Sequence, residues 1–306
     1  MPVIIRLLLT LLLALQPLLL SPVCAAAPGV IRYIPGARGD SGAQYFFQLL
    51  TESLKITEPE YPHLRLMPVE QMLHQERALR LLDQRVIDVF WTTTSREREE
   101  VALPVRIPLM AGLFGQRVLL ISGANRQAFA DIHNPSQLAQ LMAVSGHDWP
   151  DSEIMSESGL KVMREGNYLS MFRMLSQKIV DYFPRGVMEA PQELERFGRF
   201  NLVVDDHLLL SYPSAIYFFV SKDNPQLAAR LELGLQRLLA SGRFDELLFG
   251  SAHHQQGLKL LLAPGRRVLQ LDNPLAPESF QQIDQSLWFS AERYQRWQQR
   301  KVAAPN

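Results

Sequence analysis

Apolar residues recur along the chain in short runs separated by helical patterns. β-rich apolar runs at 30–34, 63–67 and 86–91 predict three strands, and the last is apolar enough to be buried on both faces. Between them, apolar positions that share one helical face predict helices at 44–54 and 76–82. The order strand, helix, strand, helix, strand is typical of a parallel sheet covered by helices.

A second set of alternating elements begins within an apolar run at 105–121, which Pro108, Gly112 and Gly115 interrupt. We expect its strands at 117–121, 143–145, 180–183, 202–204 and 216–221, and its helices at 135–142, 169–175, 225–239 and 244–248. The C-terminal tail is rich in Pro, Gln and Arg, and we expect it to wrap the protein and to end in a helix near 292–299.

These patterns predict an α/β protein of two lobes joined by two crossovers, near 108–115 and near 212–216. The first lobe is expected to hold 28–112 and 214–306, and the second lobe 113–213. A chain of 306 residues is long enough for both lobes, because single cores seldom grow past roughly 250–300 residues.

Residues 1–27 have the pattern of a cleaved secretory signal peptide. One basic residue, Arg6, precedes a leucine-rich run, and small residues follow that run. The alternative is a membrane anchor, but Gln16 and Pro17 interrupt the apolar run. We therefore expect a protein exported to the periplasm, from which cleavage has removed Cys24, the only cysteine.

Composition argues against several classes of function. Lys plus Arg and Asp plus Glu both number 31, so no excess of charge indicates a nucleic-acid partner. The seven histidines are scattered without the spacing of a zinc protease, and the chain has no glycine-rich phosphate loop. We expect neither a metal nor a cofactor, and we expect a monomer whose partner is a small solute.

The Gly-Asp-Ser-Gly segment at 39–42 resembles the nucleophile motif of some hydrolases. A catalytic serine needs a histidine base and an orienting acid, but no Asp-x-x-His pair ends at His253 or His254. We therefore interpret the segment as a glycine-rich loop that caps the following helix, and we expect no enzymatic activity.

The segment at 88–108 carries the most informative polar side chains. The strand predicted there is followed by hydroxyl groups and two guanidinium groups, which belong to Thr92, Thr93, Thr94, Arg96 and Arg98. Ligands of open α/β sheets bind at the carboxyl ends of strands. Hydroxyls beside a guanidinium hold a carboxylate or phosphate through charge-assisted hydrogen bonds. The alternative interpretation is a polar turn and helix cap with surface arginines.

This order of features resembles the type II periplasmic solute-binding proteins, in particular family 3, which includes the polar amino-acid binders. The shared features are a strand, a hydroxyl-rich turn, a (Ser/Thr)-x-Glu-Arg motif and a Pro-containing crossover. The IYFFVSKDNPQL stretch at 216–227 and the LLASGRFDELL stretch at 238–248 are also similar to that family. The HDWPD segment at 147–151 and the DYFPRG segment at 181–186 resemble an uncharacterised proteobacterial branch of the superfamily.

The resemblance implies roles for the residues of the first-lobe turn. Arg98 matches the family arginine that grips the ligand carboxylate, and Arg96 is its rival because this turn is shorter than usual. Thr92, Thr93 and Thr94 match the hydroxyl and backbone donors of the turn.

In the second lobe, the resemblance implies a ligand-contacting turn and one further cation. The turn whose amides meet the ligand contains Gly146, His147, Asp148 and Trp149. Where the amino-acid binders place an acid, this chain has Arg185. Arg185 facing Arg98 across a cleft suits a dianion, or Arg185 pairs with Asp148 or Asp181 in a closed empty form.

Together these features predict reversible capture of a small polar, anionic solute in a cleft that closes around it. The resemblance implies delivery of that solute to an ABC-type membrane permease. The alternative is an envelope interaction or sensory-input module that has the same fold and no transport role.

Overall fold

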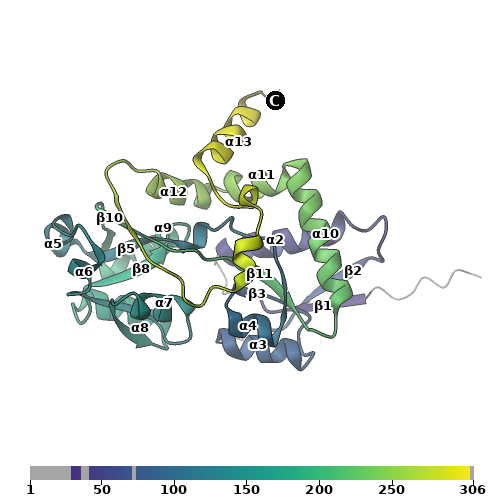
Figure 1. The fold of residues 1–306 in the computed structure, drawn as a ribbon, viewed down its shortest axis with the longest axis horizontal. Coiled ribbons are helices and arrows are strands. Elements are labelled where there is room, and N and C mark those ends of the chain that lie inside the picture. The colour runs from purple at the N-terminus through teal and green to yellow at the C-terminus, as the bar shows by residue number, and fades with distance from the viewer. Residues whose placement is uncertain (1–28, 36–40, 71–73, 304–306) are drawn as a thin grey trace, which may run out of the picture.

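The computed structural model describes residues 29–35, 41–70 and 74–303 and arranges them in two α/β lobes (Figure 1). The predicted signal peptide and residues 39 and 40 of the Gly-Asp-Ser-Gly segment lie outside the described residues. A search of the described part of the chain finds no helix that is long and apolar enough to cross a membrane.

The first lobe is built on a five-stranded sheet with the strand order β2-β1-β3-β11-β4. Its strands are β1 (Gly29–Tyr33), β2 (Leu64–Pro68), β3 (Val89–Thr93), β4 (Leu103–Val105) and β11 (Ile216–Val220). β1 is parallel to β2 and β3, as the alternating pattern predicts, whereas β11 runs antiparallel to β3 and β4. Every residue of β11 is buried, which explains why this strand is a continuous apolar run.

Seven α-helices of the described residues lie outside 116–215. They are α2 (Ser41–Lys55), α3 (Gln75–Asp83), α4 (Arg96–Val101), α10 (Pro225–Ser241), α11 (Arg243–Gly250), α12 (Ala252–Leu261) and α13 (Ala291–Ala303). Six of them accompany this sheet and the tail, and α12 packs against α9 (Ala190–Arg196) and β5 (Gln116–Ser122) of the second lobe. The residues at the two ends of α10 are typical helix-capping residues. The Asn224 side chain accepts a hydrogen bond from Leu227 N at its start, and Gly242 has φ 79° at its end. α10 packs along α2 (Figure 1).

We expect Gly234→Ala to destabilise the protein by about 1–3 kcal/mol, because a methyl group there overpacks the contact between α10 and α2. A Cβ atom at this buried position would lie 2.2 Å from the backbone oxygen of Ser53. Urea denaturation measures the change in the free energy of unfolding. Gly198→Ala is the matched control, since a Cβ atom at Gly198 meets nothing within 4 Å, and an equal loss in both variants would contradict the prediction.

The second lobe contains a seven-stranded sheet with the order β12-β10-β5-β8-β6-β7, in which β9 also pairs with β5. Its strands are β5 (Gln116–Ser122), β6 (Met142–Gly146), β7 (Lys161–Glu165), β8 (Tyr182–Gly186), β9 (Leu202–Val204), β10 (Leu208–Ser211) and β12 (Arg267–Gln270). Its helices are α5 (Arg126–Ala130), α6 (Pro135–Leu138), α7 (Pro150–Glu157), α8 (Tyr168–Ser176) and α9 (Ala190–Arg196). β6 is parallel to β7 and β8, and β5 runs antiparallel to β8.

Two crossings between the lobes lie near 108–115 and 212–216, as predicted, and the C-terminal tail adds further crossings that the sequence pattern did not predict. β4 leads through 106–115 to β5, and β10 leads through 212–215 to β11. The two crossovers touch, because Tyr212 N donates a hydrogen bond to Gly115 O at 3.1 Å. A Cβ atom at Gly115 would lie 2.0 Å from Tyr212 O, so only glycine permits this approach.

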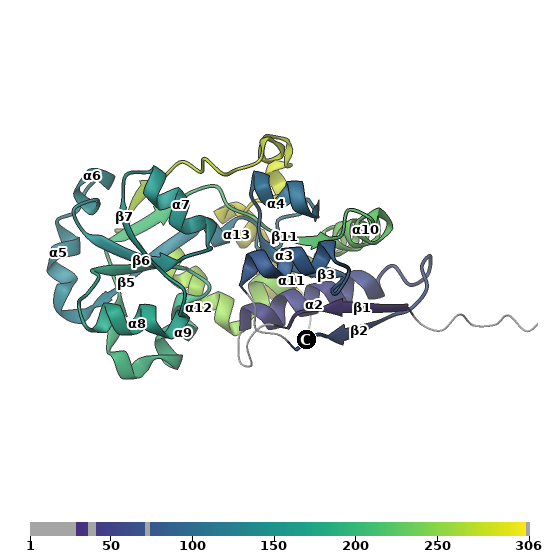
Figure 2. The ribbon, with the colours of Figure 1, turned by 90° about the horizontal axis from the view of Figure 1, so that it is seen from below.

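The C-terminal tail wraps both lobes. β12 pairs in parallel with β10, so this strand lies in the second-lobe sheet, although the sequence pattern assigns the whole tail to the first lobe. Residues 271–290, which we call the C-terminal strap, then run back to the first lobe (Figure 2). There Leu275 O accepts a hydrogen bond from Arg96 N, and the Trp288 ring packs on Gly112. The remaining lobe boundaries stay predictions.

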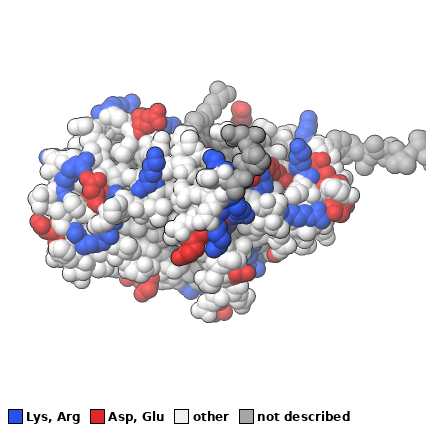
Figure 3. Space-filling model, turned by 90° about the horizontal axis from the view of Figure 1, so that it is seen from above, with Lys and Arg blue, Asp and Glu red and all other residues white. Residues whose placement is uncertain are grey.

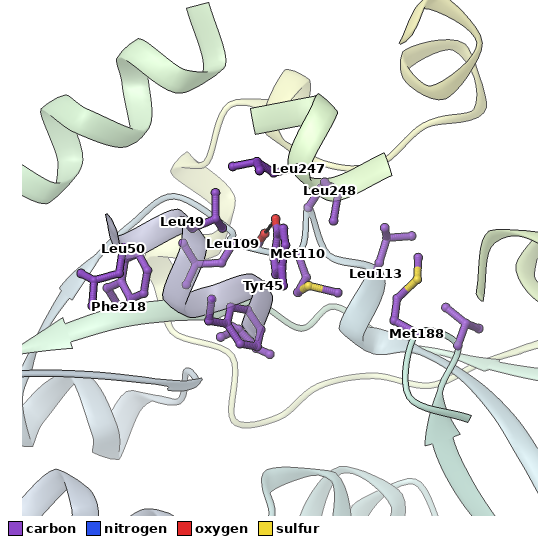
Figure 4. Close-up of a cluster of buried hydrophobic side chains, with 14 of the residues drawn as sticks. Tyr45, Leu49, Leu50, Leu109, Met110, Leu113, Met188, Phe218, Leu247 and Leu248 are labelled. Carbon is purple, nitrogen blue, oxygen red and sulfur yellow. Dashed lines mark hydrogen bonds between the residues drawn. The ribbon is translucent and has the colours of Figure 1, made fainter. Parts of the chain in front are cut away.

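One apolar cluster continues from the first lobe through the first crossover into the second lobe. Figure 4 shows Tyr45 and Leu49 of α2 beside Leu109 and Met110 of the crossover, with Met188 at the second-lobe end. Tyr45 Oη donates a hydrogen bond to Leu109 O at 2.6 Å. The crossover is therefore part of the core, and its position relative to α2 is fixed by packing.

Candidate functional site

A cavity of about 970 Å³ lies between the two lobes, beside the first crossover. Its volume is at the upper end of the range for small-ligand sites, about 300–1,000 Å³. Both lobes contribute aromatic side chains to its lining, among them Phe46, Trp91, Phe114, Trp149, Tyr168 and Phe197. An aromatic lining of this kind suits a ligand with an apolar part.

Polar groups also reach the cavity from both lobes. Thr92 and Thr93 line it at the carboxyl end of β3, where the sequence predicts a binding turn. The second lobe contributes two carboxylates and two guanidinium groups, which belong to Asp148, Glu165, Arg196 and Arg199. The cavity therefore offers hydroxyls and charges of both signs around its aromatic walls.

Arg98 lies directly behind the threonines of this wall. Ser95 caps α4 by accepting a hydrogen bond from Arg98 N, and the buried Arg98 side chain turns back toward β3. Its Nη1 donates to Thr92 Oγ1 at 2.9 Å and to Thr93 O at 2.7 Å. Burial lowers the pKa of Arg98 from its ordinary value, against the opposing charges of Asp148 and Asp151. The guanidinium still remains charged at neutral pH.

Asp148 joins the second lobe to this group. Arg98 Nη2 donates to the main-chain oxygen of Asp148 at 3.2 Å. The Asp148 carboxylate accepts a hydrogen bond from Gln75 N, the first residue of α3, at 2.9 Å. Gln75 in turn accepts from Thr92 through their side chains at 3.0 Å. At this edge of the cavity the two lobes are therefore closed onto each other.

Two residues of the predicted turn lie away from the cavity. Arg96 is exposed, and its main-chain N–H contacts the C-terminal strap. Thr94 is buried and donates to Glu99 Oε1 at 2.9 Å, which anchors α4. Neither of the two rival arginines is among the residues that line the cavity. Only Arg98 donates a hydrogen bond to the second lobe, at Asp148 O, and residues two positions apart project from opposite sides of a helix.

Trp149 forms part of the second-lobe wall. Its ring lies over Gly146, where a Cβ atom would approach the ring to 2.4 Å. The ring also stacks on Phe183 with a centroid distance of 6.3 Å and an interplanar angle of 18°. Gly146 is thus the residue that lets the turn fold its tryptophan into the cavity wall.

Arg185 does not line the cavity, which differs from the expectation that it faces Arg98 across the cleft. The strand β8 continues through Pro184 to Gly186, so Arg185 is a buried strand residue. Its Nη2 donates to Glu189 Oε1 at 2.9 Å and to Glu193 Oε1 at 2.6 Å. Arg185 therefore pairs with neither Asp148 nor Asp181, because Glu189 and Glu193, which follow it in the chain, already bind its guanidinium.

The position of Arg185 nevertheless connects it to the cavity wall. Its Cζ lies 4.8 Å from the Trp149 ring centroid and 4.9 Å from that of Phe183. Burial opposes its charge, but Glu189 and Glu193 raise the pKa of Arg185 well above its ordinary value. The guanidinium therefore stays charged and supports the wall from behind through cation–π contacts.

A second buried arginine extends this group to the crossovers. Arg117 donates to Glu189 Oε2 at 3.0 Å and also to the Asp151 carboxylate. Tyr212, in the second crossover, donates its hydroxyl to the same Asp151 carboxylate. Asp151 lies in the first turn of α7, directly after the turn that contains Trp149. The second-lobe wall is thus tied to the second crossover by the hydrogen bond from Tyr212, and Arg117 reaches the first crossover, where its Cζ lies 4.1 Å from the centroid of the Phe114 ring.

His147 lies beside the cavity with its side chain 48% exposed, and Asp148 is the buried member of that pair.

The sequence analysis missed several residues that do line the cavity, including Phe46, His74, Gln75, Asn167, Tyr168 and Arg196. Asn167 and Tyr168 follow β7, and a strand at 161–165 would have directed attention to the turn after it. The others carried no local signal, since only the fold brings them to the cavity.

The face of the molecule seen from above carries no patch of one charge that would direct a ligand (Figure 3). In the space-filling view, Lys and Arg are interspersed with Asp and Glu over that face (Figure 3). Equal numbers of the two kinds in the sequence agree with this mixture. The chemistry of the site therefore rests on the cavity itself rather than on long-range steering.

No protein-family model and no curated protein matches the chain. Solved structures do match its fold. A binding component of an ABC transporter from Wolinella succinogenes, complexed with lysine, has a TM-score of 0.54 at 17% identity, over 74% of this chain and 95% of that one. A Salmonella typhimurium periplasmic binding protein with high arginine specificity has a TM-score of 0.54 at 12% identity, over 72% and 97%.

An ancestral arginine-binding protein bound to glutamine is similar at a TM-score of 0.55 and 14% identity, over 74% of this chain and 99% of that one. These likenesses establish the fold. The chain has the two-lobed α/β fold of the type II periplasmic solute-binding proteins, which confirms the predicted fold class and the resemblance to the amino-acid binders at the level of the fold.

Proposed function

We propose that the protein is a periplasmic solute-binding protein that captures an amino acid between its lobes without chemical change. One observation carries this proposal: an aromatic-lined cavity lies between the lobes, and Arg98 lies directly behind its wall, bonded to the lining residues Thr92 and Thr93. The similar structures are described with lysine, arginine or glutamine, which supports a ligand of amino-acid size.

The charges around the cavity favour a zwitterion over the anionic solute that the sequence predicts. Arg98 is the group for a carboxylate, and Asp148 and Glu165 on the opposite lobe are acceptors for an ammonium group. Arg185, the expected second cation, is neutralised by Glu189 and Glu193. Arg196 and Arg199 also line the cavity and balance the two acids, and an α-amino acid, which carries both charges, matches this mixture better than a dianion does.

Binding of a carboxylate can replace the contact that Arg98 makes across the cleft. The bond from Arg98 Nη2 to Asp148 O is 3.2 Å long, the longest of the three that the guanidinium donates to these partners. A carboxylate accepts more strongly than a neutral carbonyl, because both partners of the hydrogen bond are then charged. This exchange removes one contact between the lobes, so the ligand stabilises closure only if its ammonium group also reaches Asp148 or Glu165 of the second lobe.

The aromatic walls suggest the kind of side chain. Phe46 and Trp91 line one side and Trp149 and Tyr168 the other, so the ligand side chain lies between rings. Burial of apolar surface stabilises a bound side chain by about 25 cal/mol per Å². We propose that the ligand is an apolar or aromatic amino acid. Export of the protein to the periplasm and delivery of the ligand to an ABC permease are parts of the same proposal.

Thermal unfolding with a panel of solutes tests this function. We expect phenylalanine or leucine to stabilise the purified protein, and a ligand at about 100 times its Kd adds about 2.7 kcal/mol. Phenylpyruvate, which lacks the ammonium group, and dicarboxylates serve as matched probes of the charge argument. We expect Trp149→Ala to reduce the shift with phenylalanine more than the shift with alanine, because alanine has no ring to pack.

Each outcome distinguishes one part of the proposal. Stabilisation by dicarboxylates alone would restore the anionic solute and overturn the zwitterion. No response to any amino acid or organic acid would contradict solute capture and favour an envelope or sensory module with this fold.

A further inference from the structure

Three side chains with metal-binding atoms meet at the edge of the cleft where the lobes touch. They belong to His74, which precedes α3 in the first lobe, and to His147 and Asp148 of the second-lobe turn. Their potential ligand atoms all lie within 4.8 Å of one another. His74 Nδ1 is 4.0 Å from Asp148 Oδ2, and His147 Nδ1 is 3.8 Å from Asp148 Oδ1.

We propose that these residues bind a divalent transition-metal ion, with Zn²⁺ the best fit, and that the ion bridges the two lobes. Two imidazoles and one carboxylate form a common zinc ligand set, which leaves a fourth position for water or a solute. With bonds of about 2.0–2.1 Å in a tetrahedral site, ligand atoms lie about 3.3 Å apart. Small side-chain rotations bring the present distances to that value.

The surroundings of the three residues suit such rotations. The side chains of His74 and His147 are 61% and 48% exposed, so both rings can turn and the ion can enter from solvent. Their centroids already lie 4.7 Å apart, edge to face. Asp148 is the fixed member, because its side chain is only 6% exposed and Gln75 N holds one carboxylate oxygen at 2.9 Å. A hydrogen bond of this kind orients a ligating carboxylate.

The neighbouring charges leave the carboxylate available. Arg98, the nearby cation, donates to the main-chain oxygen of Asp148 and not to its carboxylate. Glu165 lines the same cavity, and its main-chain oxygen accepts a hydrogen bond from the main-chain N–H of His147. The Glu165 carboxylate adds negative charge near the site. Imidazole ligands select a transition metal over Ca²⁺ or Mg²⁺, which prefer oxygen ligands.

A bridging ion favours the closed form, because it binds ligands from both lobes only when the lobes meet. The proposal goes beyond amino-acid capture and does not depend on it. The two share one residue, Asp148, whose carboxylate would serve either the ion or the ammonium group, but the aromatic walls and the Arg98 guanidinium are not metal ligands. His74 and His147 lie far apart in the sequence, which explains why the sequence analysis predicted no metal site.

Calorimetric titration of the untagged, EDTA-treated protein with ZnCl₂ tests the site. We expect one ion per chain and a rise in the thermal unfolding temperature. His74→Ala and His147→Ala should each weaken Zn²⁺ binding at least about tenfold, as loss of a metal ligand or its support does. His133→Ala, which removes an exposed histidine elsewhere, is the matched control and should bind like the wild type.

Absence of Zn²⁺ binding, or equal binding by all three variants, would overturn the proposal. Weakening by His147→Ala alone would also contradict it, because the first lobe would then supply no ligand. The amino-acid panel is measured separately in EDTA, so failure of the metal site and failure of solute capture are distinguishable.

Discussion

Replacing Arg98 with alanine should weaken amino-acid binding by about 2–5 kcal/mol while the protein still folds, as expected when a buried charged hydrogen-bonding group loses its partner. The guanidinium lies behind the cavity wall at the end of β3, and its bonds to Thr92 and Thr93 fix its direction. Calorimetric titration with the best amino acid of the thermal panel measures the change in Kd. Arg98→Lys should recover only part of the affinity, because an ammonium group cannot reproduce the planar fork.

Arg96→Ala is the matched control for this prediction. Arg96 is exposed and contributes its main-chain N–H, which alanine keeps, to the strap. We expect its affinity to equal that of the wild type. Unchanged binding in Arg98→Ala together with a loss in Arg96→Ala would transfer the anchoring role to the neighbour and require a different arrangement of α4.

The choice between these two arginines shows what local sequence chemistry can decide. Both lie in α4, which follows β3, and the sequence analysis leaves both open. The structure resolves their directions through Ser95, which caps α4 and sets Arg98 on the inner side of the helix. A serine before Arg-Glu-Arg-Glu is a readable capping signal, so this part of the site was within reach of the sequence.

Most of the fold was predictable because its strands are strongly apolar. The central strands β5 and β11 are buried along nearly their whole length, and their runs are the clearest in the sequence. Short or polar edge elements gave no such signal. β4 has three residues and contains Pro104, and β12 carries exposed side chains at a sheet edge. Their pairing partners lie far away in the chain, so tertiary contacts decide them.

The misplacement of Arg185 has a definite physical origin. A proline usually marks the end of a strand, and the predicted strand stops before Pro184. In the structure Pro184 pairs in register with Leu119, and β8 continues to Gly186. Arg185 is therefore fixed within the sheet. Its partners Glu189 and Glu193 come from the following segment, and nothing in a single sequence separates such acids from surface carboxylates.

The C-terminal strap is a feature that the resemblance to known binders did not anticipate in detail. It leaves β12 in one sheet and returns to the first crossover, where Trp288 packs on Gly112 and Phe289 N donates to Ala111 O at 2.8 Å. Packing at a crossover opposes the backbone rotation that hinge opening requires. The contacts across the cleft and the strap thus act in the same direction, toward the closed form.

Replacing Arg185 should have the largest effect on stability. We expect Arg185→Ala to lower the free energy of unfolding by about 3–5 kcal/mol, because it leaves buried carboxylates without a counter-charge. The Glu193 side chain is only 9% exposed, and Tyr168 donates its hydroxyl to the same carboxylate. Loss of the guanidinium also removes the support behind the Trp149 ring. Urea denaturation followed by circular dichroism measures the loss.

Two further variants identify the cause of that loss. Arg164→Ala breaks an exposed ion pair with Glu153, in which both side chains are about 40% exposed, and should cost at most about 1 kcal/mol. The double variant Arg185→Met/Glu193→Gln removes charge from both partners, so it should recover part of the stability that Arg185→Ala loses. If the double variant is less stable than Arg185→Ala, the uncompensated charge of Glu193 is not the cause. The packing of Arg185 between Trp149 and Phe183 would then be the dominant contribution.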